Sequence, residues 1–115
     1  MFFEMNLGGG GTSIDVSNPD YYSTGSISVS ANGTYTVNCG CRAKYVLATC
    51  RSGSTSTSQF GWVFCDAENQ KSVSLWGSDN QCYPHDDTIS DVTDTSFVFK
   101  NPFGAQEYYK FLVYA

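Results

Sequence analysis

The chain has 115 residues, the length of one small domain, and its hydrophobic (41%) and aromatic (16%) content is enough for a packed core. Charged residues make up only 15%, whereas Ser and Thr occur 15 and 10 times, a composition that favours strands and turns over long surface helices. The net charge of -5, with the basic residues scattered from Arg42 onward, argues against a basic patch that binds nucleic acid.

Residues 1–25 differ from the rest of the chain because they contain four consecutive glycines and no strong periodicity. Gly-rich segments are flexible and bury little surface. We expect an extended N-terminal arm that anchors the domain to a partner, with a frayed terminus as the alternative. The residues expected to serve assembly are Asn6, Leu7, Gly8, Gly9, Gly10 and Gly11. Residues 26–115 then form the folded domain.

Apolar and polar residues alternate along two segments, residues 26–31 and 34–39, which indicates two half-buried strands. The Asn32–Gly33 dipeptide between them is a strong signal for a β-hairpin. A two-residue loop would put the apolar residues of the two strands on opposite faces of the sheet. We therefore predict a three-residue loop or bulge, with Gly33 at positive φ and Val29 opposite Val37.

Five further strands are expected, at residues 43–50, 59–66, 72–76, 95–100 and 106–115. The first and the last are apolar on both faces, which is typical of strands inside a sheet. In the strand 72–76, Val73 and Leu75 are expected to point inward. Between the strands, residues 76–87 are expected to form a long loop. About seven or eight short strands without a helix predict an all-β fold, a small antiparallel β-sandwich with an extended arm.

The segment CGC (Cys39 to Cys41) could be a metal clamp, a redox pair or a strand and turn. No C-x-x-C spacing is present, so we predict no metal site and no cofactor, with a zinc site as the alternative. Five cysteines, an odd number, and an N-terminus unlike a signal peptide favour reduced, buried thiols; a Cys39–Cys50 disulfide is the alternative. No apolar run reaches the roughly 18 residues of a membrane span, so no membrane insertion is expected.

Most of the residues that could act in catalysis or bind an ion lie between residues 79 and 94. His85 is the only histidine, and the G-x-S-x-G motif that would support a serine nucleophile is absent, so we predict no catalytic residue and no enzyme activity. Five aspartates in this window could bind a cation or attract a basic partner, but turn formation is the favoured interpretation. They are Asp79, Asp86, Asp87, Asp91 and Asp94.

The loop expected at residues 76–87 combines flat apolar rings with planar hydrogen-bonding groups, a mixture that suits sugar rings. The same residues would also fit an ordinary loop whose aromatic side chains point inward. The candidate binding residues are Trp76, Asp79, Asn80, Gln81, Tyr83 and His85. Residues 52–58 and 101–106 are expected to lie on the same distal surface.

Residues 32–49, NGTYTVNCGCRAKYVLAT, resemble a pattern in small C-terminal β domains of bacteriophage tail and fibre proteins. There, a G-x-Y-x-V strand leads into a G-F-x-P-x-Y-V turn and an apolar strand. The matching residues are Gly33, Tyr35, Val37, Gly40, Arg42, Lys44, Tyr45 and Val46. The chain departs at Cys41, where the family has an aromatic residue, and at Ala43, where it has proline. Residues 89–99 and the final YYKFLVYA are also similar, so the resemblance covers about residues 31–50 and 86–115.

The resemblance implies a virion structural protein, a tail or fibre appendage subunit that serves assembly and attachment to the host surface. It also implies assembly in the bacterial host cytoplasm, contacts with other virion proteins, a homo-oligomer (a trimer by preference) and a bacterial surface glycan or protein as receptor. The alternative is a stand-alone carbohydrate-binding β-sandwich module. An enzyme and an acidic inhibitor of a basic partner are the other classes considered.

Overall fold

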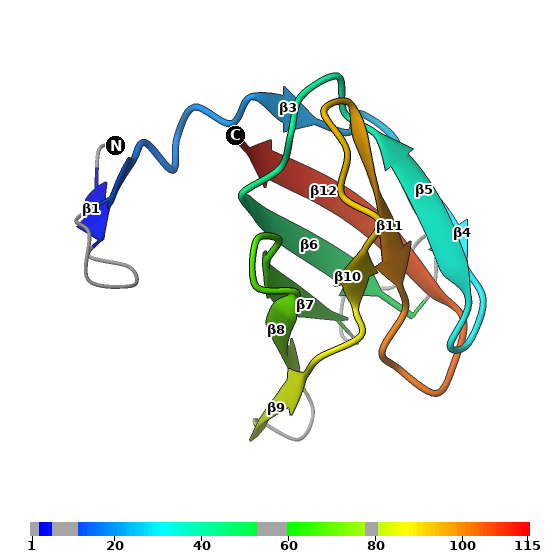
Figure 1. The fold of residues 1–115 in the computed structure, drawn as a ribbon. Coiled ribbons are helices and arrows are strands. Elements are labelled where there is room, and N and C mark those ends of the chain that lie inside the picture. Colours follow the sequence, from blue (N-terminus) through cyan, green and yellow to red (C-terminus); the bar gives the residue numbers. More distant parts are fainter. Residues whose placement is uncertain (1–2, 6–11, 53–59, 78–80) are drawn as a thin grey trace.

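The computed structural model describes residues 3–5, 12–52, 60–77 and 81–115, and the described residues contain strands and turns but no helix (Figure 1). Accordingly, none of them belongs to a helix that could cross a membrane. The strands are β1 (Phe3–Met5), β2 (Thr12–Ile14), β3 (Tyr21–Tyr22), β4 (Ile27–Val29), β5 (Thr34–Asn38), β6 (Tyr45–Arg51), β7 (Phe60–Asp66), β8 (Lys71–Trp76), β9 (Gln81–His85), β10 (Ile89–Ser90), β11 (Ser96–Lys100) and β12 (Glu107–Tyr114). The predicted all-β class is confirmed.

Ten of these strands form two antiparallel sheets. The large sheet has the order β3-β12-β6-β7-β8-β9, and β4 pairs with β12 beside β3. The small sheet has the order β10-β11-β5 and lies across the face of the large sheet, giving a sandwich of two layers (Figure 1). β6 and β12 are interior strands, as their apolar faces predicted. The short strands β3, β9 and β10 account for the difference from the seven or eight strands expected.

The core lies between the two sheets and is dominated by aromatic contacts between β11 and β12. The ring of Phe99 lies edge-on to Tyr109 at 4.8 Å and to Phe111 at 5.0 Å, measured between centroids. Such edge-to-face pairs add about 1 kcal/mol each to the burial of apolar surface. The same face of β6 and β7 carries small residues, among them Ala48, Cys50 and Gly61. The large rings of β11 and β12 therefore fill the space that the small residues of β6 and β7 leave in the core.

The predicted hairpin of residues 26–39 is wrong, because β4 pairs with β12 and β5 pairs with β11. The turn carries the chain from one sheet to the other, so Val29 and Val37 are both buried in the core without pairing with each other. Asn32, not Gly33, takes the positive φ (55°), and the Gly33 N–H donates to the Ser30 carbonyl at 2.9 Å. A Cβ at Gly33 would lie 3.1 Å from the Ser30 carbonyl and would displace the Ser30 hydroxyl, so glycine fits this close turn without a local shift.

Two expectations for residues 72–87 are also wrong. Ser74 is buried and points inward, whereas Val73 and Leu75 face outward, where their strand partners are Phe64 and Trp62. The outer face of the large sheet is itself apolar here, so hydrophobicity did not identify the inner face. The expected long loop contains β9, an edge strand that pairs with β8.

The segment CGC follows β5 directly and forms a turn. The buried Cys39 thiol donates to the Cys41 carbonyl at 3.1 Å, and Gly40 has φ +74° and donates its N–H to the Thr95 carbonyl at 2.9 Å. All five cysteines are free thiols. Among the described residues, no group of three or more His, Cys, Asp or Glu side chains is placed to hold a metal ion. The geometry of this segment is therefore that of a strand and turn.

Candidate binding cleft

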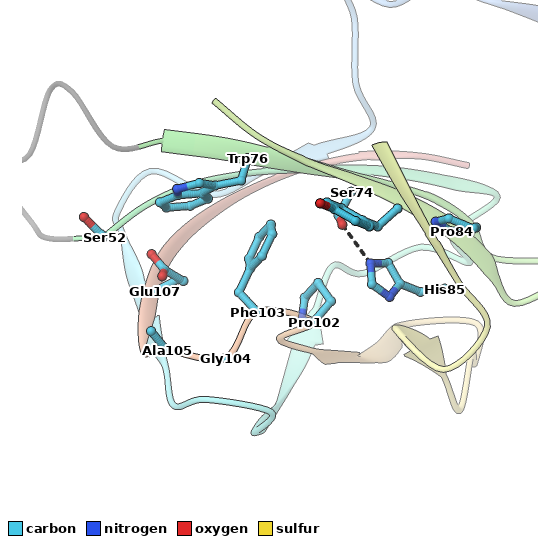
Figure 2. Close-up of a pocket in the computed structure, with 11 residues that line it drawn as sticks. Ser52, Ser74, Trp76, Pro84, His85, Pro102, Phe103, Gly104, Ala105 and Glu107 are labelled. Carbon is cyan, nitrogen blue, oxygen red and sulfur yellow. Dashed lines mark hydrogen bonds between the residues drawn. The ribbon is translucent and has the colours of Figure 1, made fainter. Parts of the chain in front are cut away.

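A cleft of about 720 Å³ opens on the inner face of the large sheet at β8 and β9, and we call it the β8–β9 cleft (Figure 2). The inward-facing Ser74 is buried, but its strand partner Tyr83 on β9 is exposed, so this face of the sheet becomes open to solvent at β9. The described lining residues are Ser52, Ser74, Trp76, Tyr83, Pro84, His85, Pro102, Phe103, Gly104, Ala105 and Glu107. The volume falls within the roughly 300–1,000 Å³ of small-molecule sites.

Two aromatic rings from different elements form one wall of the cleft. The indole of Trp76 and the ring of Phe103 lie 5.2 Å apart between centroids, at an interplanar angle of 60°. Trp76 lies opposite Gly61 in the register of β7 and β8. A Cβ at Gly61 would lie 2.7 Å from Cε3 of the indole, closer than packing allows, and would also collide with the Leu75 carbonyl. The glycine in β7 therefore makes the position of the indole possible.

The loop of residues 101–106 forms the floor of the cleft and is held by the buried side chain of Asn101. Its Nδ2 donates to the carbonyls of Val29 (3.2 Å), Ser30 (3.1 Å) and Ala105 (2.9 Å). Its Oδ1 accepts from the Phe103 N–H at 3.0 Å and from the Tyr109 hydroxyl at 2.5 Å. These five hydrogen bonds fix the loop that carries Phe103, so Asn101 positions one aromatic wall without lining the cleft itself.

At the other side of the cleft, His85 Nε2 and the Ser74 hydroxyl form a hydrogen bond of 2.7 Å (Figure 2). A nucleophilic serine needs an accessible hydroxyl and a base that is oriented by a third group. Ser74 is only 1% exposed, and no described carboxylate accepts a hydrogen bond from the His85 ring. The pair fits a structural bond between β8 and β9.

Glu107 contributes a carboxyl group to the cleft from the first residue of β12. The residue is 3% exposed, and no described donor lies within hydrogen-bond distance of its Oε2. Burial raises the pKa of this carboxyl above its ordinary value of 4.5, because the charged form loses hydration. Figure 2 shows the carboxylate on the side of Trp76, Ser52 and Phe103, away from His85. A buried carboxylate at a cleft wall, with one oxygen that lacks a described donor, can act on a ligand through its charge.

The candidate residues from the sequence divide into three groups. Trp76, Tyr83 and His85 line the cleft together, while Gln81 lies beside them on β9 and accepts a hydrogen bond from the Tyr83 hydroxyl at 3.0 Å. Asp79 and Asn80 lie outside the described residues, as do the assembly residues 6–11 of the arm. Each of the three segments expected on one distal surface contributes a described residue to the cleft, namely Ser52, Trp76 and Phe103, while residues 53–58 lie outside the described residues.

Sequence reasoning missed Glu107 and Ser74 as cleft residues, and it included Phe103 only as part of the range 101–106. The signal for Glu107 was present: it occupies the same alternating face of its strand as Tyr109, Phe111 and Val113, which are core positions. A carboxylate in a core register is rare unless it is paired or functional. Ser74 and Phe103 had no comparable signal, because both residue types are common on strands and in loops.

Of the five aspartates for which a cation site was the alternative to turn formation, Asp87 and Asp94 are paired with basic side chains, and Asp79 lies outside the described residues. The Lys100 ammonium contacts the Asp87 carboxylate at 2.9 Å, and the Arg42 guanidinium contacts Asp94 at 3.4 Å. The hydrogen bond from Lys100, helped by its positive charge, lowers the pKa of Asp87. Both pairs are exposed, so solvent screens their charges and they contribute little to the stability of the fold.

A second apolar surface lies on the outer face of the large sheet and encloses a groove of about 500 Å³. Tyr45 and Phe64 stack there with centroids 6.1 Å apart. The groove is lined by Ile14, Val16, Tyr45, Leu47, Thr49, Trp62, Phe64, Val73 and Tyr114. Ile14 and Val16 come from the segment before β3, so the start of the described domain already lies on this face.

Comparisons with known proteins give no match to a family model, a curated protein or a solved structure.

Proposed function

We propose that this protein is a non-enzymatic binding domain whose β8–β9 cleft holds a glycan, and that it serves as a bacteriophage tail or fibre appendage subunit that attaches to the host surface. The observation that carries the binding half is the arrangement of Trp76, Phe103 and Tyr83 around a cleft that also contains the buried carboxyl of Glu107. The appendage half rests on the sequence resemblance.

The cleft offers both kinds of contact that a pyranose ring requires. The faces of Trp76 and Phe103 can contact the C–H faces of a sugar, while Glu107 and the Tyr83 hydroxyl can hydrogen-bond to its hydroxyl groups. Aromatic side chains give rigid contact area at a low cost in conformational entropy, which favours binding at an open site. The burial of Ser74 supports a binding role over a catalytic one.

A glycan array tests the binding half with purified wild-type protein and three variants. We expect Trp76→Ala and Tyr83→Ala to abolish or strongly reduce binding to the glycans that the wild type recognises. Tyr35→Ala is the matched control, because Tyr35 is 40% exposed on β5, close to the 42% of Tyr83. Binding that survives both cleft substitutions, or no glycan binding at all, would contradict this half of the proposal.

The assembly half predicts that the arm anchors the domain to other virion proteins or to copies of itself. β1 and β2 pair with each other and with neither layer, whereas contacts with the large sheet involve residues after 11, such as Ile14 in the outer groove and the Val16 carbonyl, which accepts from the Tyr114 hydroxyl. Removal of residues 1–11 should therefore leave the domain folded while reducing the oligomer seen by light scattering. A strict monomer whose truncated form still enters virions would rule this half out. A monomer that binds glycans would favour the stand-alone module.

A further inference from the structure

Glu107 supplies the one carboxyl group among the described residues that line the β8–β9 cleft, while the imidazole of His85 lies at the other side (Figure 2). The described lining residues of the cleft include no Lys or Arg, and Oε2 of Glu107 has no described hydrogen-bond donor. An ionised carboxylate buried without a partner destabilises the protein, and a ligand that supplies a positive charge would remove that cost. The net charge of -5 also favours the approach of a cation.

The groups that face Glu107 from neighbouring strands do not supply this charge. Cys50 on β6 and Tyr109 on β12 are both buried near it. Burial raises the pKa of Cys50 to about 12 and raises the pKa of Tyr109 as well, so both side chains are neutral at physiological pH. Of the described groups on this side of the cleft, Glu107 is thus the one that ionises.

The walls beside Glu107 are aromatic, which adds a second preference for positive charge. Trp76 and Phe103 are tilted by 60° at 5.2 Å, so their faces enclose a corner of the cleft rather than stack on each other. Aromatic faces attract ammonium groups through the ring quadrupole, and indole does so most strongly. Figure 2 shows Trp76, Phe103 and Glu107 on the same side of the cleft.

We propose that the β8–β9 cleft selects ligands that carry an organic ammonium group, with Glu107 as the counter-charge and the Trp76 and Phe103 faces as walls. This inference rests on the proposed glycan-binding function and narrows its ligand class. Two sources share the chemistry: a protonated amino sugar within a surface glycan, and a quaternary ammonium substituent such as choline. The hydroxyl-rich ring of the sugar would extend from this corner toward Tyr83 and His85.

Calorimetric titration with two matched pairs of probes tests the inference. Glucosamine is compared with glucose, and choline is compared with its neutral carbon isostere, 3,3-dimethyl-1-butanol. We expect one or both ammonium probes to bind about tenfold or more tightly than the neutral partner, the scale of a desolvated cation–π contact plus a charge pair. Preference in the glucosamine arm identifies an amino sugar, and preference in the choline arm identifies a quaternary ammonium.

Variants of Glu107 separate charge recognition from folding. Glu107→Gln should reduce the affinity for the ammonium probe to that of its neutral partner, whereas Glu107→Asp, which keeps a carboxylate, should retain part of the preference. Glu68→Gln is the control, because Glu68 is exposed in the turn between β7 and β8. Circular dichroism of each variant confirms that it is folded.

Equal binding of charged and neutral probes would overturn the inference, as would a preference that persists in Glu107→Gln. If array glycans bind in a manner that depends on Trp76 but without any preference for amines, the inference fails and the proposed function stands. If neither glycans nor probes bind, both fail.

Discussion

At the scale of single residues, Glu107 is the point where stability and binding compete. Its pKa is raised in the folded protein, so the folded state binds a proton more tightly than the unfolded state. The stability contributed by the protonated carboxyl is fully present below about pH 4.5, the ordinary glutamate value, and is lost as pH rises through the raised pKa. Above the raised pKa the folded protein holds a buried carboxylate, whose charge a cationic ligand can compensate.

This account predicts that Glu107→Gln raises the free energy of unfolding near pH 7 and that the gain disappears near pH 4. Glutamine has nearly the same shape and carries no charge, so only the cost of the buried carboxylate is removed. Urea denaturation at the two pH values measures the difference, with Glu68→Gln as the exposed control. A variant that is less stable than the wild type at pH 7 would show that Glu107 has a favourable partner.

The cysteines lead to a prediction about thiol reactivity. Cys82 is exposed on the edge strand β9, whereas burial raises the pKa of both Cys50 and Cys65 to about 12. Because the thiolate is the reactive form, native protein at pH 8 should be alkylated first at Cys82, and at Cys50 and Cys65 only after unfolding. Peptide mass spectrometry after brief iodoacetamide treatment measures the fraction of each cysteine that is alkylated. Fast labelling of Cys65 in the native state would contradict its place in the core.

At the scale of elements, the loop between β11 and β12 depends on Asn101. Asn101→Ala removes five hydrogen bonds and leaves the buried carbonyl of Val29 and the part-buried carbonyl of Ser30 without this donor. We expect a loss of about 3 kcal/mol in the free energy of unfolding, near the upper range for one buried polar network. Asn38→Ala on the exposed face of β5 is the control. A loss below about 1 kcal/mol would mean that the loop is held by its other contacts.

Strand β7 sets the position of Trp76 through Gly61. Gly61→Ala places a methyl group against the indole and the Leu75 carbonyl, so we expect a loss of about 2 kcal/mol in stability, as in other overpacked sites, and weaker ligand binding. Gly25→Ala is the matched control, since a Cβ at Gly25 meets nothing within 4 Å. Unchanged stability together with unchanged binding would indicate that the indole can move away freely.

The elements also differ in how far the sequence could predict them. The cores of β6, β11 and β12 were predictable, because their apolar patterns are long and unambiguous. β9 was read as a loop because Gln81–His85 has no alternation and contains Pro84, a residue that sheets accept only at edges. The sequence identified a turn at Asn32–Gly33, but the same dipeptide can connect two strands of a hairpin or two strands that belong to different sheets. The long-range partners β11 and β12 decide between the two.

At the scale of the whole molecule, the cleft exists because the two sheets differ in width. The three-stranded sheet covers the core residues of β12, β6 and β7, and the inner face near β9 is left open. Residues at positions 52, 76 and 103 meet there only after the sheets stack, so the chain order does not reveal the site. The sequence could indicate candidate loops, but not the Glu107 carboxyl beside them.

The most direct test of this account uses the two tryptophans, which lie on opposite faces of the large sheet. Trp76 lines the β8–β9 cleft and Trp62 lines the outer groove, so their two indole N–H signals in a proton–nitrogen NMR spectrum report the two faces separately. A Trp62→Phe variant assigns the signals. On titration with glucosamine or choline, we predict that the Trp76 signal shifts while the Trp62 signal stays in place. A shift of Trp62 alone, or of neither, would contradict the cleft as the binding site.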